Sequence, residues 1–173
     1  MKLQFTYGRL PPGLTLKDPA TLVATWFGSG LVPFASGTWG TLAALPFAWA
    51  IWSLGGWNLL ALATLCVSAL GIWAADAVST RTGVKDAGFV VVDEVAGMWL
   101  TLLAAPFTPA GWIAAFVLFR IADILKPFPA GWADRSVRGG LGVMLDDLLA
   151  ALWSALAVWL LATYGPLETA FAQ

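Results

Sequence analysis

The distribution of charge constrains this chain more than any other sequence feature. No Lys, Arg, Asp or Glu occurs between Pro19 and Ala75, and the 173 residues are 60% hydrophobic and 11% charged. A soluble domain is usually about 45–50% apolar and about 25% charged. Too few polar side chains remain to cover a water-facing globule of this size, so we expect lipid to cover part of the surface.

The uncharged region divides into two apolar runs, Thr41–Leu54 and Trp57–Ala75, on either side of Gly55-Gly56. A hydrocarbon core about 30 Å thick needs roughly 20 helical residues. The second run has this length, and the first reaches it if it begins near Thr38. Glycines flanked by tryptophan favour a tight turn at a membrane interface. The pattern predicts a helical hairpin.

A second hairpin is predicted further along the chain. The stretch Val95–Phe119 is uncharged but contains Pro106 and Pro109, and two prolines so close together disfavour one continuous helix. We therefore expect one helix over Val91–Ala105 and a second, returning helix over Gly111–Lys126.

Two further helices complete the predicted fold. Leu148–Leu167 has the length of one bilayer crossing, and Asp18 with Pro19 can begin a short helix, which is expected to lie at the interface. The predicted class is all-α: a polytopic membrane helical bundle with about five apolar helices, two hairpins plus a final span. It forms a single domain over 1–173, with a flexible segment at 1–17, no cleaved signal, and a tail at 168–173.

The hairpins bring three polar regions to one side of the membrane: the N-terminus, residues 76–94 and residues 120–147. All nine Lys and Arg fall in these regions. The positive-inside rule then assigns this side to the cytoplasm. The net charge of −1 excludes a general attraction to nucleic acid.

Paired acids are the strongest chemical signal. Asp93-Glu94 and Asp146-Asp147 are each expected to open an apolar helix. One acid at a helix start complements the helix dipole, but two adjacent acids at two starts favour a functional site. The chain has no histidine, and its one cysteine is Cys66. It therefore lacks the usual ligands of a zinc site and the cysteine pairs of a disulfide framework. Oxygen ligands alone indicate a hard cation, Mg²⁺.

Basic residues accompany these acids. Arg120, Asp123 and Lys126 step by three and share a helix face, which is compatible with an ion-pair ladder. The surplus positive charge also suits a phosphate. A loop of small and hydroxyl residues over 28–41 could add backbone amides. Asp76 is interpreted as a helix-end charge.

Several phosphatase mechanisms are excluded by inspection. A phosphohistidine route has no histidine, and the sixth residue after Cys66 is Ile72, not the arginine of a cysteine-nucleophile loop. No Asp-x-Asp-x-Thr sequence and no P-loop lysine occur. A metal-activated water and a carboxylate nucleophile both stay open.

From Thr25 to about Leu160, the chain resembles the phosphatidylglycerophosphatase A family. Five blocks in order carry the resemblance: Phe27–Leu31, Gly37–Ala44, Val92–Trp99, Phe119–Pro127 and Gly139–Asp147. Positions matching the family motifs are Gly37, Thr38, Gly40, Asp86, Asp93, Glu94, Arg120, Asp123, Lys126, Asp134, Arg135, Asp146 and Asp147. Ser36 departs from the family pattern, which is expected to have proline there.

The resemblance implies an Mg²⁺-dependent phosphomonoesterase that converts phosphatidylglycerophosphate to phosphatidylglycerol and phosphate. It also implies a multi-pass protein of the bacterial cytoplasmic (inner) membrane, with its active site facing the cytoplasm among membrane lipids.

Roles for individual residues follow from this hypothesis. Glu94, Asp123 and Asp146 would ligate the metal, with Asp93 or Asp147 as a second ligand or general base. The predicted phosphate-binding groups are Arg120, Lys126, Arg135, Arg138, Gly37 and Thr38. The main competing function is a small membrane transporter or channel that uses the acidic cluster as an ion site. A non-catalytic membrane scaffold and a lipid headgroup transferase are further candidate functions.

Overall fold

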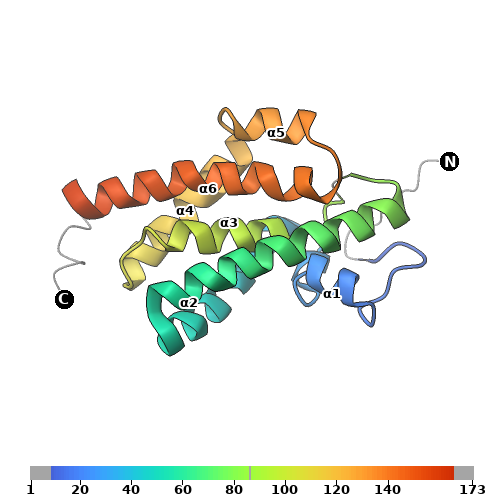
Figure 1. Cartoon of the computed structure of the whole chain (residues 1–173), viewed down its shortest axis with the longest axis horizontal. Helices are drawn as coiled ribbons and strands as arrows, with labels where there is room; N and C mark the ends of the chain where they lie inside the picture. Colours follow the sequence, from blue (N-terminus) through green and yellow to red (C-terminus); the bar gives the residue numbers. More distant parts are fainter. Residues whose placement is uncertain (1–8, 86, 166–173) are drawn as a thin grey trace.

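The computed structural model describes residues 9–85 and 87–165. The regular elements within these residues are all helices, as predicted. The described residues form six α-helices, which are labelled in Figure 1, and one short 3-10 helix. Their bounds are α1 Pro19–Ala24, η1 Ser29–Leu31, α2 Ser36–Thr82, α3 Val92–Leu102, α4 Pro109–Leu125, α5 Ala130–Ser136 and α6 Gly139–Tyr164. Three predicted features lie outside the described residues: the family position Asp86, the tail at 168–173 and residues 1–8 of the N-terminal segment.

The long helix α2 is interrupted at its centre. Gly55 and Gly56 have non-helical backbone angles, and the chain reverses there, so that two helical halves run back along each other (Figure 1). Gly56 has a φ of 60°, which glycine adopts without strain. Gly40 and Gly71 lie equally far from this break. Gly40 packs against Val91 at the start of α3, and Gly71 packs against Met144 of α6 and against Val92.

Helix α3 lies at the centre of the bundle, packed between α2 and α6 and against α4. All its residues are buried except Glu94 and Leu100, which are partly buried. Its eleven residues extend about 16 Å, roughly half the thickness of a hydrocarbon core. The helix is therefore shorter than the predicted segment Val91–Ala105.

Helix α6 begins nine residues before the predicted Leu148, at Gly139. Consequently Asp146 and Asp147 lie two turns inside the helix, and the expectation that they open it was wrong. Gly140 is a packing site at this start, because a side chain there would collide with the backbone of α2.

Asp76 holds the start of α6 in place. Its Oδ1 accepts a hydrogen bond from the Gly140 N–H at 3.1 Å. Asp76 lies within α2, six residues before Thr82 ends the helix, so its interpretation as a helix-end charge was also wrong.

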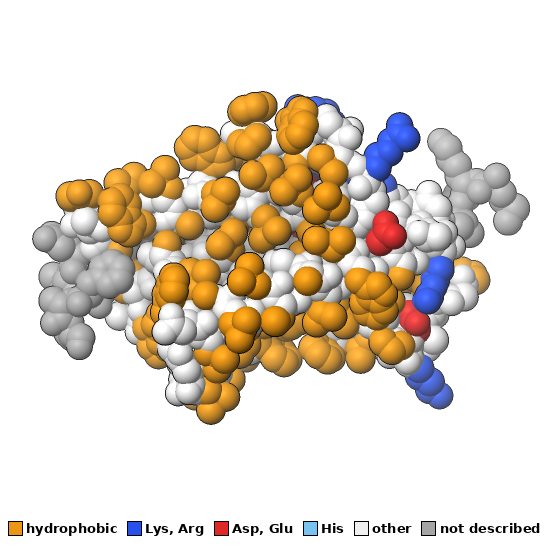
Figure 2. Space-filling view, in the orientation of Figure 1, with side chains coloured by type: hydrophobic (Ala, Val, Ile, Leu, Met, Phe, Trp, Pro, Cys, Tyr) orange, Lys and Arg blue, Asp and Glu red, His pale blue; other side chains and the backbone are white. Residues whose placement is uncertain are grey.

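Two helices, α2 and α6, are long and apolar enough to cross a membrane. Only 33% and 50% of their most apolar windows are buried, so much of their apolar surface faces outward. Figure 2 shows hydrophobic side chains over most of the visible face and charged side chains toward one end. A surface of this kind associates with membrane lipid.

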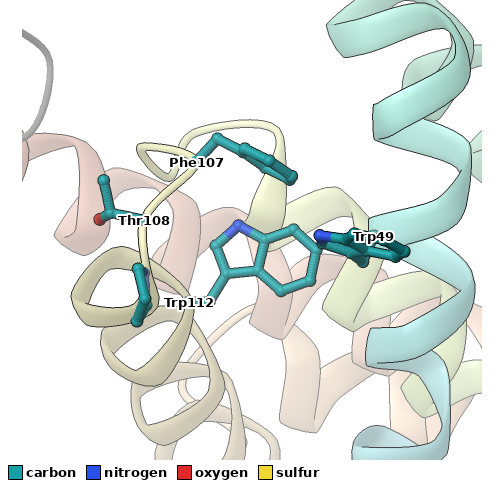
Figure 3. A pocket seen from close by; sticks show the side chains of 5 residues that line it. Trp49, Phe107, Thr108 and Trp112 are labelled. Atoms are coloured by element: carbon teal, nitrogen blue, oxygen red, sulfur yellow. The ribbon is translucent and has the colours of Figure 1, made fainter. Parts of the chain in front are cut away.

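Aromatic side chains gather where α2 reverses and α4 begins. Trp52 stacks on Phe107 with ring centroids 5.1 Å apart. Figure 3 shows Trp49, Phe107 and Trp112 around a pocket of about 240 Å³ beside the first residue of α4. Such a cluster is typical of a membrane interface.

The predicted cap of α1 is confirmed. Asp18 Oδ2 accepts from the Thr21 N–H at 3.0 Å and lies 2.7 Å from Arg81 Nη1. These contacts, the Thr21 amide first, lower the pKa of Asp18. The pair links α1 to the end of α2 and is exposed, so its contribution to stability is small.

Gly97 gives the sharpest test of this packing. A Cβ atom there would lie 2.5 Å from the fully buried ring of Phe119. We expect Gly97→Val to lower the apparent free energy of unfolding in detergent by about 1–3 kcal/mol, through overpacking. The control is Gly88→Val, at a site with no neighbour within 4 Å. Equal stability of the two variants would contradict the close packing of α3.

Candidate active site

Three carboxylates converge where α3 meets α6. Asp93 and Glu94 occupy the first turn of α3, and Asp147 comes from α6. One oxygen of each lies within 4.8 Å of the others. Asp93 and Asp147 are only 7% and 3% exposed. We call these three residues the acidic cluster; among the described residues it is the group compact enough to hold a metal ion.

Arg120, on the last turns of α4, faces this cluster. Its Nη1 lies 2.5 Å from Asp123 Oδ2 and 3.9 Å from Glu94 Oε1. The same nitrogen donates a hydrogen bond to Thr41 Oγ1 at 3.4 Å. The guanidinium is thus held between two carboxylates and a hydroxyl, which fixes its direction.

The first turn of α2 leaves room for this arrangement. A Cβ at Gly37 would lie 3.1 Å from both terminal nitrogens of Arg120 and would overlap Glu94 Oε1. Thr41 donates to the Gly37 carbonyl at 2.8 Å and is completely buried. Glycine at position 37 therefore permits the Arg120–Glu94 pair.

Lys126 forms a second, adjoining group. It ends α4 in a left-handed conformation with a φ of 45°, which directs the side chain away from the helix line. Its ammonium pairs with Asp146 and lies 3.4 Å from Asp134 Oδ1 on α5. Lys85 donates to the Asp134 carbonyl. The expected ladder along α4 therefore forms only between Arg120 and Asp123.

Buried polar atoms without a hydrogen-bond partner among the described residues include Glu94 Oε2, Asp147 Oδ2 and Arg120 Nε. Buried polar groups are rarely left unsatisfied in native proteins, and exceptions often mark a binding function. The two oxygens suit a cation and the guanidinium N–H suits an anionic oxygen. Because the donors are all carboxylate oxygens, the cluster fits a hard divalent ion.

The predicted residues divide into two groups. The first group surrounds one point and comprises Asp93, Glu94, Asp123, Asp147, Arg120 and Gly37. The second group, beside the first, is the pair of Asp146 and Lys126. Thr38 follows Gly37 in the first turn of α2. Arg135 on α5 and Arg138 at the start of α6 are exposed.

The predicted metal ligands were Glu94, Asp123 and Asp146. The acidic cluster shares Glu94 with that set but contains Asp93 and Asp147 instead of the remaining two. Asp123 and Asp146 lie against the basic side chains. The predicted set stays a prediction.

Two contributors were missed from the sequence. Thr41 was expected only within a motif block and within a loop over 28–41, but α2 begins at Ser36, so residues 36–41 are helical and that part of the loop prediction was wrong. The position of Thr41 four residues after Gly37, on the same helix face, could have indicated its role. Lys85 reaches the backbone of Asp134 across 49 residues, and no sequence signal pointed to that contact.

Comparison with known proteins gives consistent results. A model of the family described as phosphatidylglycerophosphatase A matches residues 22–162. Phosphatidylglycerophosphatase A of Escherichia coli (strain K12) is 41% identical over 155 residues, covering 89% of this chain and 90% of that protein. Its counterpart in Haemophilus influenzae is 40% identical over 147 residues, covering 84% and 90%.

A third relative carries a different name. A Bacteroides thetaiotaomicron protein, provisionally described as a phosphatidylinositol-3-phosphatase, is 41% identical over 157 residues, covering 81% of this chain and 94% of that protein. No solved structure matches the chain. The family match spans most of the sequence and includes every residue of the acidic cluster together with Arg120 and Lys126. The chain therefore belongs to the phosphatidylglycerophosphatase A family.

Proposed function

We propose that this chain is a membrane phosphatase that hydrolyses phosphatidylglycerophosphate to phosphatidylglycerol and phosphate. The observation that carries the proposal is the buried acidic cluster facing Arg120 across a short gap. The family match and the names of the Escherichia and Haemophilus relatives support the substrate. The Bacteroides relative makes a phosphoinositide the natural comparison lipid.

The acidic cluster is proposed to hold Mg²⁺ through Asp93, Glu94 and Asp147. Its compactness and the two unsatisfied oxygens support this assignment. A bound Mg²⁺ would neutralise charge on the phosphate and lower the pKa of a bound water. The ligand set predicted from the sequence has Asp123 and Asp146 in place of Asp93 and Asp147.

The protein side chains then position the reactants. Arg120, fixed by Asp123 and Thr41, binds a phosphate oxygen through its fork. As the water attacks phosphorus, the bond from phosphorus to the glycerol oxygen of the headgroup breaks. Asp93 or Asp147, through a carboxylate oxygen that is not on the metal, takes the proton of the water and passes it to that glycerol oxygen. Amides in the first turn of α2, near Gly37 and Thr38, bind a second phosphate oxygen, since a helix N-terminus favours anions. Phosphoryl transfer depends mainly on such positioning and charge stabilisation.

The proposed setting is the bacterial inner membrane, with the α2 hairpin and α6 crossing it, the α3–α4 hairpin inserted from the cytoplasmic side, and the site on that side. The two apolar helices and the reversal at Gly55-Gly56 support this layout, as does the positive-inside rule. A transporter or channel would require charges through the membrane depth. Support for that function is weaker, because no charged residue lies in the second half of α6 or in the first half of α2.

Glu94→Gln provides the primary test. The variant should release inorganic phosphate from phosphatidylglycerophosphate about a hundredfold more slowly, or slower still, because a proposed carboxylate ligand of Mg²⁺ is lost. The assay uses detergent-solubilised protein, with and without Mg²⁺, and phosphatidylinositol 3-phosphate as the comparison lipid. The control is Asp18→Asn, which removes a partly exposed carboxylate outside the acidic cluster. Full turnover by a folded Glu94→Gln protein would overturn the proposal.

The two neighbouring acids of α6 distinguish the two ligand sets. If Asp147 is a ligand, Asp147→Asn should raise the Mg²⁺ concentration for half-maximal activity by about 10–100-fold, a range typical of losses at metal sites. Asp146→Asn should instead lower turnover through Lys126 without that shift. The opposite pattern would favour the ligand set with Asp123 and Asp146.

Thiol labelling tests the membrane layout. In a Cys66→Ser background, cysteines introduced by Thr80→Cys and Ser136→Cys should react from the same aqueous side. Ser53→Cys, beside the reversal of α2, should react from the opposite side. All three positions are exposed. Labelling of positions 80 and 136 from different sides would be incompatible with one shared site.

A further inference from the structure

Two apolar grooves lie along the outer face of α6, one on each side of Trp153. The first, between α4 and α6, has a volume of about 280 Å³. The second, between the α4–α5 connection and α6, has a volume of about 290 Å³. The first is lined by Leu118, Ala122, Leu125 and Pro127 with Trp153 and Ala157. The second is lined by Pro129, Leu149, Leu152, Trp153 and Leu156.

The ridge between the grooves is fixed in place. Trp153 Nε1 donates to the Phe128 carbonyl at 3.1 Å, although the side chain is half exposed. The polar side chain at the base of the first groove, Ser154, donates to the carbonyls of Ala150 and Leu118. The grooves therefore offer apolar surface with no unsatisfied side-chain donor, which suits hydrocarbon.

Both grooves begin at the charged site. Pro127 in the first and Pro129 in the second belong to the connection that starts at Lys126, whose ammonium pairs with Asp146. Ala122, in the first groove, immediately precedes Asp123. From Asp146 to Ala157 the helix rises about 16 Å, which is about the depth of one leaflet. The grooves thus run from the Lys126–Asp146 pair, which adjoins the acidic cluster, into the hydrocarbon.

We propose that these grooves bind the two acyl chains of the lipid substrate, with Trp153 between the chains. This inference rests on the proposed function. The occupant is a diacyl lipid because two similar grooves share one ridge and converge beside a cation-containing site, as two chains converge on one phosphorylated headgroup. The aromatic pocket in Figure 3 does not compete, because it lies beside the first residues of α4, at the end of that helix away from Lys126.

Obstruction of the grooves should separate chain binding from chemistry. Ala157→Phe narrows the first groove and Leu156→Trp narrows the second. Each should lower kcat/KM for dioleoyl phosphatidylglycerophosphate about tenfold. Turnover of the deacylated, water-soluble headgroup should stay close to the wild-type rate. The control is Leu160→Trp, on the same helix outside both grooves and similarly exposed, 44% against 47% for Leu156. Unchanged kcat/KM for the diacyl lipid would overturn the inference.

Photolabelling of the wild-type protein gives a second readout that does not depend on how the variants fold. A substrate with a diazirine in each acyl chain should label peptides covering 118–127 and 149–157, and excess unlabelled substrate should compete. If phosphatidylcholine reduces the labelling equally well, the grooves bind ordinary bilayer lipid without selectivity for the substrate, and the inference is overturned. Wild-type protein that releases no phosphate from the diacyl lipid would instead overturn the proposed function itself.

Discussion

The structure depends on placing several carboxylates at the edge of an apolar bundle, where their negative charge needs partners. Removing a charge from water costs several kcal/mol unless a partner compensates it. Here Arg120 serves Asp123 and Glu94, and Lys126 serves Asp146 and Asp134. The acidic cluster retains more negative charge than these cations offset. That excess supports binding of a divalent ion, and through it a phosphate.

The fold provides this arrangement by close helix approach. Small residues let α3 pass between α2 and α6: Gly40 and Gly71 on α2, and Gly97 on α3 itself. Helix–helix interfaces in membranes commonly use small residues in this way. As a result, the start of α3, the end of α4 and the second turn of α6 meet at one level. The site is assembled from segments that are distant in sequence.

Much of this could be predicted from sequence, because helix class, the break at Gly55-Gly56 and the grouping of Asp93, Glu94 and Arg120 depend on local patterns of charge and hydrophobicity. The start of α6 could not be predicted, because the glycine pair Gly139-Gly140 is typical of a flexible connection, and only the structure shows the contact with Asp76 that holds it. The choice of basic partner for each acid also could not be predicted, since the left-handed backbone at Lys126 directs its side chain away from α4 and toward Asp146. Tertiary geometry decides which oxygen meets which nitrogen.

The adjacency of Asp146 and Asp147 inside α6 links two tasks to one helical register. Successive residues on a helix point about 100° apart, so one acid turns toward Lys126 while the next turns toward Asp93 and Glu94. A deletion or insertion of a single residue between Gly140 and Asp146 would rotate both carboxylates off their targets together. The number of residues in this stretch is thus constrained as tightly as the identity of the two acids.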